Sequence, residues 1–298
     1  MPEPSHTGVG MMPPVQRLYD RGVSSRPTVP VDLVVNCFER TYREVLAPGH
    51  LQAIEDDNAV RFERRTVLIN NVDCRDDARD LAAARVEAGE IDRWIFVADL
   101  LDDALRQTGL HRADLGAVPY FTDWALVAVT VDGLDNVLLW DADVRLHRPI
   151  DWVRPALELM DRDARVLIAN PNWEFPNLGR FTFETDGDFH LGHGASDQVM
   201  LGRRSELGRP IYSDRTLALR RYPVSHLADI FEARIDSHLR RSGRMRATYA
   251  PAVYRHGTKM GTSYPHQPLM TRVRQERDRM ITRLLRWSPW RPRHLRQL

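Results

Sequence analysis

Two carboxylates, Asp141 and Asp143, follow an unbroken apolar run at residues 137–140. Such a run is typical of a strand that is buried on both faces of a parallel sheet. Because residues i and i+2 of an extended chain point the same way, both carboxylates can aim at one point just beyond the strand. Two carboxylates at one place repel each other unless a cation lies between them. The spacing therefore predicts a site for a hard divalent ion, Mg²⁺ or Mn²⁺, which can also hold a diphosphate.

An apolar strand that leads into Asp-x-Asp in mid-chain resembles the GT-A class of nucleotide-sugar-dependent glycosyltransferases. In that class the two carboxylates hold the metal that binds the diphosphate of the sugar nucleotide. The resemblance, over roughly residues 31–261, implies an α/β fold of the Rossmann-like kind. This fold has a mostly parallel sheet with helices on both faces and a smaller mixed acceptor-side subdomain. It also implies a metal-dependent transferase that moves a sugar from a UDP- or GDP-sugar to a hydroxyl of a glycan, a lipid-linked or a small-molecule acceptor.

The resemblance extends to a third metal ligand and a cation for the diphosphate. Several families of this class use a histidine from a C-terminal strand or loop, with a lysine or arginine nearby. His256 and Lys259 resemble that pair by position and residue type, although the best-known version, His-x-x-Gly-x-x-Lys-Pro-Trp, has another spacing. With Asp141 and Asp143, an imidazole ligand favours Mn²⁺. A surface histidine in a glycine-rich turn is the alternative interpretation of His256.

Nucleotide contacts are expected past the first two predicted strands, at residues 38–40 and at Asp73. The full set of nucleotide-sugar-binding residues that the resemblance implies is Phe38, Glu39, Arg40, Asp73, Trp140, Asp141, Asp143 and Lys259.

Asp197 and Gln198 are the expected catalytic residues, because they resemble an acidic residue or Asp-Gln pair that several of these families place near the reacting sugar. An inverting enzyme needs a base for the acceptor hydroxyl, and Asp197 is the first candidate. A retaining enzyme needs a carboxylate or amide beside the sugar, and Gln198 is available. The cap of a helix or strand is the alternative interpretation of both residues. Asp229 and Glu232 are further acid or base candidates, unless they face solvent.

The elements that position these residues alternate between strand and helix. Ahead of the two carboxylates we predict strands at 31–37, 66–71 and 94–98, and helices at 41–46, 77–89, 100–108 and 120–131. This alternation predicts a parallel sheet. After them we predict a helix at 151–160, a strand at 166–170, a short strand or hairpin near 181–184, a strand or short helix at 196–202, a helix at 224–242 and a strand at 248–255. Neither GxGxxG nor GxxxxGK[ST] is present, which argues against a dinucleotide dehydrogenase and a P-loop NTPase.

Four segments follow from this pattern. Residues 1–30 are proline-rich and form a flexible leader, residues 31–147 form the nucleotide-sugar-binding half, and residues 148–268 form the acceptor and catalytic half of the same domain. Residues 269–298 form a basic amphipathic tail. From residue 272 onward its arginines outnumber its acids, a composition typical of a helix that lies on a membrane surface. A helix packed on the catalytic domain, with its arginines in water, is the alternative.

Composition sets the class and the expected compartment. The formal net charge is +1, so nothing global indicates nucleic acid as a partner. Cys37 and Cys74 are expected to be free thiols, because a chain of this size needs no disulfide. A signal peptide and an apolar run of about 18 residues are both missing, so we expect a cytoplasmic protein, with possible docking of residues 272–298 at the inner face of the membrane. The near-exclusive use of arginine over lysine favours a bacterial source.

Two alternatives to a glycosyltransferase stay open. The run into Asp141 and Asp143 also resembles the first motif of haloacid-dehalogenase-type phosphatases, hhhhDxDx[TV]. Arg145 stands where that motif has Thr or Val, and the strand at 166–170 ends in Asn-Pro and not in Ser or Thr. The second alternative is a catalytically inactive GT-A domain that binds a nucleotide or a partner.

Overall fold

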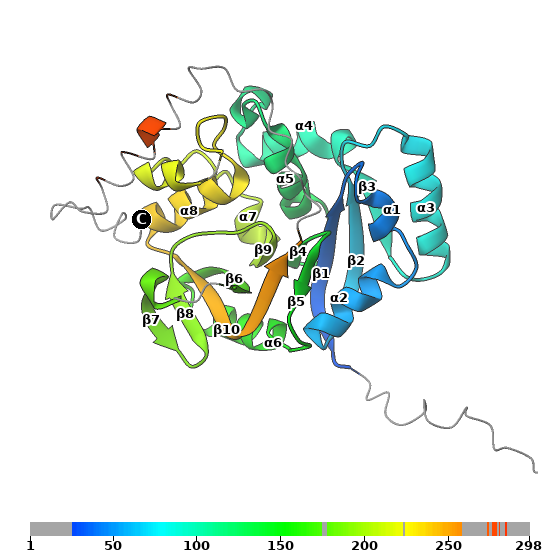
Figure 1. Ribbon diagram of the computed structural model, residues 1–298, viewed down its shortest axis with the longest axis horizontal. Coiled ribbons are helices and arrows are strands. Elements are labelled where there is room, and N and C mark those ends of the chain that lie inside the picture. Colours follow the sequence, from blue (N-terminus) through cyan, green and yellow to red (C-terminus); the bar gives the residue numbers. More distant parts are fainter. Residues whose placement is uncertain are drawn as a thin grey trace, which may run out of the picture.

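The computed structural model describes residues 26–174, 178–222 and 224–257, together with residues 273, 276–278, 280 and 284. In this part of the chain one mixed sheet runs in the order β3-β2-β1-β4-β9-β6-β10-β8-β7, and β5 pairs with β10 (Figure 1). The strands are β1 (Thr28–Cys37), β2 (Arg61–Ile69), β3 (Arg93–Phe96), β4 (Asn136–Asp141), β5 (Val144–Leu146), β6 (Val166–Trp173), β7 (Thr182–Asp186), β8 (Phe189–Gly192), β9 (Val199–Arg203) and β10 (Met245–His256). The α-helices are α1 (Tyr42–Val45), α2 (His50–Asn58), α3 (Arg75–Glu87), α4 (Val97–Thr108), α5 (Asp123–Thr130), α6 (Val153–Arg162), α7 (Arg204–Leu207) and α8 (Phe231–Ser242). Short 3₁₀ helices are η2 (Arg112–Leu115), η3 (Pro119–Phe121), η4 (Leu178–Phe181) and η5 (Leu217–Arg221).

Strands β1 to β4 form the parallel half of the sheet. β1 pairs in parallel with β2 and β4, and β2 pairs in parallel with β3. Parallel neighbours need crossover connections, and α1 to α5 lie in these crossovers. The register places Asn36 beside Asp141 and Cys37 beside Ile69, so β1, β2 and β4 end at one edge. The predicted parallel α/β half is confirmed, and β1 and β2 begin a few residues earlier than expected.

Each face of the sheet is closed by its own apolar core. In β1, Leu33 enters the core that includes residues of α2, α3 and α6, whereas Val34 enters the core that includes residues of α4, α5 and α8. β4 alternates in the same way, with Trp140 in the first core and Leu139 in the second. Burial on both faces explains why residues 137–140 carry no polar side chain. Figure 1 shows α4, α5 and α8 together on one side of the sheet and α6 on the other.

The second half of the sheet is mixed. β9 runs antiparallel to both β4 and β6. β10 runs parallel to β6 and antiparallel to β8 and β5. The hairpin predicted near residues 181–184 is confirmed as β7 and β8, which turn at Gly187 with a φ of 55°. The smaller mixed subdomain on the side after the two carboxylates is therefore present.

The predicted helix at 224–242 is wrong at its start, because α8 begins only at Phe231. The backbone N–H of Phe231 donates to the Thr122 hydroxyl at 3.1 Å, and this tertiary contact lies at the first residue of the helix. Before it, the carbonyl of Leu227 accepts from Ala117 N–H at 3.4 Å and is not used for a longer helix. Apolar spacing reports which residues are buried, but it does not report such tertiary partners.

Two local features differ from the predicted pattern. Thr41 directly precedes α1 but does not cap it with its side chain, because the Thr41 hydroxyl accepts from Phe38 N–H at 3.1 Å. The three-residue strand β5 was not predicted. It forms because Val144 and Leu146 stand opposite His256 and Tyr254 of β10, more than a hundred residues away.

Several predictions fall on residues that the structure does not describe. These are the leader up to residue 25, Lys259 and most of the tail at 269–298. At Asp278 the tail touches the domain, since its buried carboxylate lies 2.6 Å from Arg220 Nη1. Both cysteines are free, as expected; Cys37 is buried and Cys74 is exposed. None of the helices in the described part of the chain combines the length and apolar character that a membrane crossing requires.

Candidate functional site

Asp141, Asp143 and His256 meet at the edge where β4 ends. Nε2 of His256 lies 2.9 Å from Oδ1 of Asp143 and 3.3 Å from Oδ2 of Asp141. One ligand atom from each of the three residues lies within 4.8 Å of the other two. β4 delivers Asp141 and the turn after it delivers Asp143, while β10 brings in His256 because it pairs with β5 directly opposite Val144. Three side chains with oxygen and nitrogen donors therefore face one small volume.

The surroundings of Asp143 fit a bound cation. Both of its carboxylate oxygens are buried, and neither accepts a well-aligned hydrogen bond from the described residues. Its backbone carbonyl accepts from Gly257 N–H at 3.0 Å. A Cβ at position 257 would lie 3.0 Å from Oδ2 of Asp143, so the glycine lets the end of β10 approach the carboxylate closely. A buried carboxylate that lacks hydrogen-bond donors is a costly charge unless a positive group faces it.

His256 supplies that positive charge when no metal is present. Burial lowers the pKa of His256, but its contacts with the carboxylates of Asp141 and Asp143 outweigh burial and raise this pKa to about 10. The same nitrogen that carries the proton is a metal ligand once the proton leaves. Two carboxylates and one imidazole form a donor set that fits Mn²⁺ or Mg²⁺, and the imidazole favours Mn²⁺.

Two more carboxylates lie behind this cluster. Burial and the charge of Asp141 raise the pKa of Asp197 to about 7. Burial, and then the charge of Asp197, raise the pKa of Glu232 well above its usual range. The backbone N–H of Asp197 donates to the carboxylate of Glu232. The structure thus brings Asp197, the expected catalytic residue, close to Asp141 and His256, and it adds Glu232, for which exposure to solvent was the alternative.

Gln198 belongs to the same region. Its backbone carbonyl accepts from Asp141 N–H at 2.8 Å, which extends the pairing between β4 and β9 by one residue. Its side-chain oxygen accepts from the hydroxyl of Tyr254 at 3.3 Å, and that hydroxyl lies 3.2 Å from the Ser196 hydroxyl. Tyr254 is fully buried, so it fixes the orientation of Gln198 from beneath.

The expected nucleotide contacts gather at the same edge of the sheet. Residues 38–40 follow directly after β1, whose Asn36 is the register partner of Asp141. The backbone N–H of Asp73 donates to Glu39 Oε2 at 2.8 Å and ties the loops after β1 and β2 together. The sequence did not indicate Asn36, which is buried and whose Oδ1 accepts no hydrogen bond from the described residues. A polar residue near the end of an otherwise apolar strand was the available signal.

Trp140 is a correction to the expected nucleotide-sugar contacts. Its side chain is fully buried in the core beneath the sheet, and its indole Nε1 donates to the carbonyl of Val144 at 3.2 Å. Successive side chains of a strand point to opposite faces, so Trp140 points away from the side that Asp141 takes. Its role in the structure is to hold the turn that carries Asp143. Lys259, the expected diphosphate contact, lies outside the described residues.

Comparisons with known proteins give likeness in structure only. No family model matches the sequence, and no curated protein matches it. The structure is similar to a mannosyltransferase from Pyrobaculum calidifontis in complex with GDP-Man and Mn²⁺, with 14% identity and a TM-score of 0.43 over 91% of this chain and 67% of that one. It is similar to glucosyl-3-phosphoglycerate synthase from Mycobacterium tuberculosis in complex with Mn²⁺, UDP and phosphoglyceric acid, with 12% identity and a TM-score of 0.42 over 88% and 78% of the two chains.

A third similar structure is GalNAc-T7 with UDP, GalNAc and Mn²⁺, at 10% identity and a TM-score of 0.42, over 78% of this chain. This chain spans 44% of the length of GalNAc-T7. All three solved structures hold Mn²⁺ together with UDP or GDP-Man. At these identities and TM-scores the likeness decides nothing about activity, so function has to be inferred from the side chains of this chain.

Proposed function

We propose that the chain is a metal-dependent glycosyltransferase that moves a sugar from a nucleotide-sugar donor to an acceptor hydroxyl. The observation that carries the proposal is the convergence of Asp141, Asp143 and His256 at the carboxyl edge of a parallel sheet. Ligands of open α/β sheets bind at this edge. The two buried oxygens of Asp143 call for a positive partner, and the negative field of Asp141 and Asp143 that raises the pKa of His256 also favours a divalent cation there.

Transfer of a glycosyl group leaves negative charge on the departing diphosphate. A divalent metal held by Asp141, Asp143 and His256 would stabilise that charge without a proton transfer. The geometry favours a nucleoside diphosphate over a single phosphate, because the loops after β1 and β2 extend the edge on the far side of Asp141. We place the base and ribose of a UDP- or GDP-sugar over Phe38, Glu39, Arg40 and Asp73, and Lys259 at the diphosphate.

Asp197 is our candidate for the base that takes the proton of the acceptor hydroxyl. A pKa of about 7 matches this role, since a base works best when its pKa lies near the working pH. Glu232, which accepts from the backbone of Asp197, would share or hold the proton. This assignment corresponds to an inverting enzyme. Gln198, oriented by Tyr254, would then contact the sugar or the acceptor.

The proposal is tested by calorimetric titration with UDP-, GDP- and dTDP-sugars in the presence of Mn²⁺, Mg²⁺ or a chelator. We expect one nucleotide class to bind only with metal and to be turned over when suitable acceptors are supplied. Binding that is equally strong in the chelator would remove the metal from the account. Metal-dependent binding without turnover of any donor would favour the inactive-domain alternative, and release of phosphate from phosphate esters would favour the phosphatase.

A further inference from the structure

A second polar cluster lies next to the proposed active site. It consists of Arg221 at the end of η5, Asp236 and Arg240 of α8, and Arg246 of β10. Asp236 is fully buried, with Arg240 Nε 2.8 Å from its Oδ1 and Arg221 Nε 3.3 Å from its Oδ2. Arg221 and Arg240 thus share one carboxylate, and the charge of Glu232 also acts on Arg221. Arg246 adds a third guanidinium group to the cluster.

Two of these guanidinium groups converge on the backbone of Gly194. A Cβ built at Gly194 would lie 2.6 Å from Nη2 of Arg221 and 3.1 Å from Nη1 of Arg246. The glycine has a φ of 110°, a conformation that other residues rarely adopt. Gly194, which has no side chain, therefore lies where the guanidinium groups of Arg221 and Arg246 approach each other. Like charges at close range are favourable only when an anion lies between them.

Arg246 itself lacks a contact partner for its charge within the described ranges, although the charge of Asp236 acts on it from farther away. Among the described residues its guanidinium makes no hydrogen bond or ion pair, and its Nε is buried. Thr248 follows on the same face of β10, and its buried hydroxyl also lacks a partner in this part of the chain. Asn170 of β6 stands in register with Thr248, and its buried Oδ1 is likewise without a donor. Buried polar groups are normally satisfied, so a row of unsatisfied groups indicates that something else binds there.

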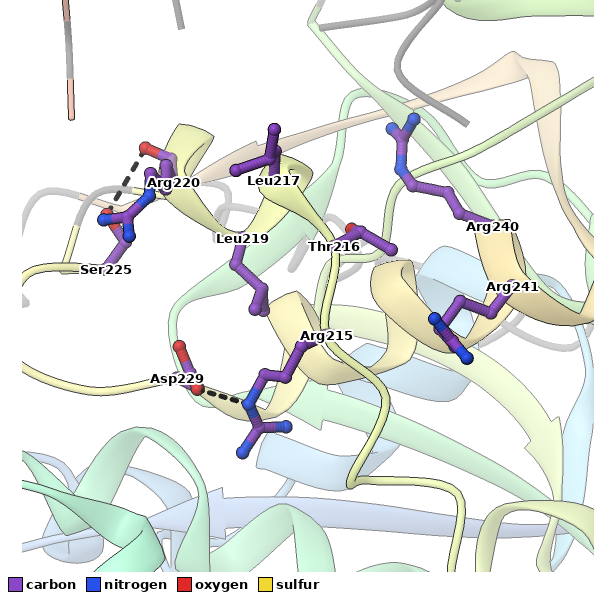
Figure 2. A pocket seen from close by; sticks show the side chains of 9 residues that line it. All are labelled: Arg215, Thr216, Leu217, Leu219, Arg220, Ser225, Asp229, Arg240 and Arg241. Atoms are coloured by element: carbon purple, nitrogen blue, oxygen red, sulfur yellow. Dashed lines mark hydrogen bonds and ion pairs between the residues drawn. The ribbon is translucent and has the colours of Figure 1, made fainter. Parts of the chain in front are cut away.

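The cavity that Arg240 also lines does not have this row of unsatisfied groups. Its volume is about 860 Å³, and Figure 2 shows Arg215, Arg220, Arg240 and Arg241 among its lining side chains. The arginines of this cavity are compensated one by one: Arg215 lies 2.8 Å from Asp229, Arg220 lies 2.6 Å from Asp278, and Arg241 lies 2.8 Å from Asp214. The cavity is lined by paired charges, whereas the inner cluster contains Arg246, which makes no ion pair with a described residue.

The inner cluster is continuous with the proposed catalytic residues. On α8, Glu232, Asp236 and Arg240 recur at intervals of four residues, so they lie along one face about 6 Å apart. The first of them accepts from the backbone N–H of Asp197, and the other two belong to the arginine cluster. Gly194 and Asp197 lie three residues apart on the loop between β8 and β9. The charges of Glu232 and Arg246 both act on the hydroxyl of Tyr254, which contacts Gln198.

We propose that Arg221 and Arg246, beside Gly194, form an oxyanion subsite that binds a phosphate or carboxylate group of the acceptor. That the anionic group belongs to the acceptor rests on the proposed function, whereas the anion site itself follows from the geometry of the cluster. One helical turn separates the cluster from Glu232, so the acceptor hydroxyl lies only a few bonds from the anionic group. The acceptor is thus a phosphorylated or acidic hydroxy compound, either free or as the headgroup of a lipid. A neutral glycan would offer no anionic partner to Arg246.

The first experiment measures binding of inorganic phosphate to the chelator-treated full chain by calorimetry, so that no metal can hold the phosphate. We expect Arg246→Gln to weaken phosphate binding roughly tenfold or more, the scale of one charge-assisted hydrogen bond. Arg246→Lys keeps the charge and should retain most of the affinity. Arg241→Gln is the matched control, because this neighbour of Arg240 is exposed and paired with Asp214, and it should bind as the wild type does. Thr248→Val provides a second test of the subsite, with a nearly unchanged side-chain volume, and should also weaken binding.

Equal phosphate affinity of the wild type, Arg246→Gln and Thr248→Val would overturn the subsite, as would no binding by the wild type at all. Asp141→Asn should bind phosphate like the wild type, whereas Arg246→Gln should keep metal-dependent nucleotide binding. These two results separate a failure of the subsite from a failure of the proposed function. Phosphatidylcholine vesicles that contain phosphatidic acid distinguish the sources. If the protein is retained on these vesicles and Arg246→Gln is not, the anion is a lipid headgroup. If the protein binds free phosphate but is not retained on the vesicles, the anion belongs to a small acceptor.

Discussion

Nε2 of His256 lies 2.9 Å from Oδ1 of Asp143, although the two residues are more than a hundred positions apart in the chain. The contact joins the turn after β4 to the end of β10. It arises because β5, directly after Asp143, turns back and pairs with the last residues of β10. The proposed metal site is therefore built at the junction between the parallel half of the sheet and its mixed half. Four expected outcomes concern individual residues of this junction and its surroundings, and a fifth concerns the pair of aspartates itself.

Metal binding should release a proton from His256. The carboxylates around it hold its pKa at about 10, so near neutral pH the metal-free protein carries the proton that the ion must displace. Calorimetric titration with Mn²⁺ in buffers of different ionisation enthalpy measures the number of protons released, which should be close to one. His256→Gln should abolish this release and weaken Mn²⁺ binding roughly ten- to a hundredfold or more. The exposed His111→Gln serves as control, and a loss of affinity of equal size there would contradict the assignment.

Asp197→Asn should reduce turnover with little effect on donor binding. Removal of a general base typically costs on the order of 10²- to 10⁴-fold in rate. The pH–rate profile of the wild type should rise through a pKa near 7, and the variant should lose this limb. Glu206→Gln is a matched carboxylate control on the surface, since Glu206 pairs with Arg244. A variant whose turnover and pH profile match those of the wild type would remove Asp197 from the chemistry.

The folded protein should lose stability in acid through His193. Burial, followed by the charges of Arg240, Arg221 and Arg246, lowers the pKa of His193 from 6.5 to about 4. A lowered pKa in the folded state means that this group contributes its full stability above pH 6.5 and loses it as the pH falls toward 4. Urea unfolding of His193→Asn and the wild type measures the difference. The gap between the two proteins should change across that window, and a gap that is constant with pH would contradict the prediction.

Trp140→Phe should lower stability and leave nucleotide affinity intact. The indole is fully buried and donates to Val144, so the smaller ring loses this hydrogen bond and leaves a small cavity. We expect a cost of about 1–3 kcal/mol in the free energy of unfolding, the scale of one lost buried partner plus a cavity. Urea unfolding and a nucleotide titration on the same preparation check both parts. Unchanged stability together with lost nucleotide binding would restore Trp140 as a ligand contact.

The parallel half of the fold could be predicted because its signals are local. The apolar run at 137–140, the helical spacing between strands and the i, i+2 pair Asp141 and Asp143 are all visible within short windows of sequence. His256 could be proposed from its position after the last strand. In each case the residue type and its immediate neighbours carry the information.

The remaining parts depend on partners distant in the chain. The start of α8 follows from a hydrogen bond to Thr122, and the turn at Asp143 follows from the register of β5 with β10. Trp140 is among the contacts that the family resemblance implies, but the alternation of side chains along a strand already separates it from Asp141. The arginine cluster could not be predicted, because it depends on contacts between distant elements. Arg221, Arg240 and Arg246 come from three elements, and only the packing of α8 on β10 brings them together.

The most direct test of the account is Mn²⁺-dependent nucleotide binding by Asp141→Asn and Asp143→Asn, with the exposed Asp161→Asn as control. Because both residues lie at an edge of the sheet and not in its core, the two variants should fold and melt close to the wild type in the presence of a chelator. We predict that neither binds UDP or GDP in a metal-dependent manner, whereas Asp161→Asn binds as the wild type does. If either variant binds the nucleotide with wild-type affinity in the presence of Mn²⁺, the proposed metal site is wrong.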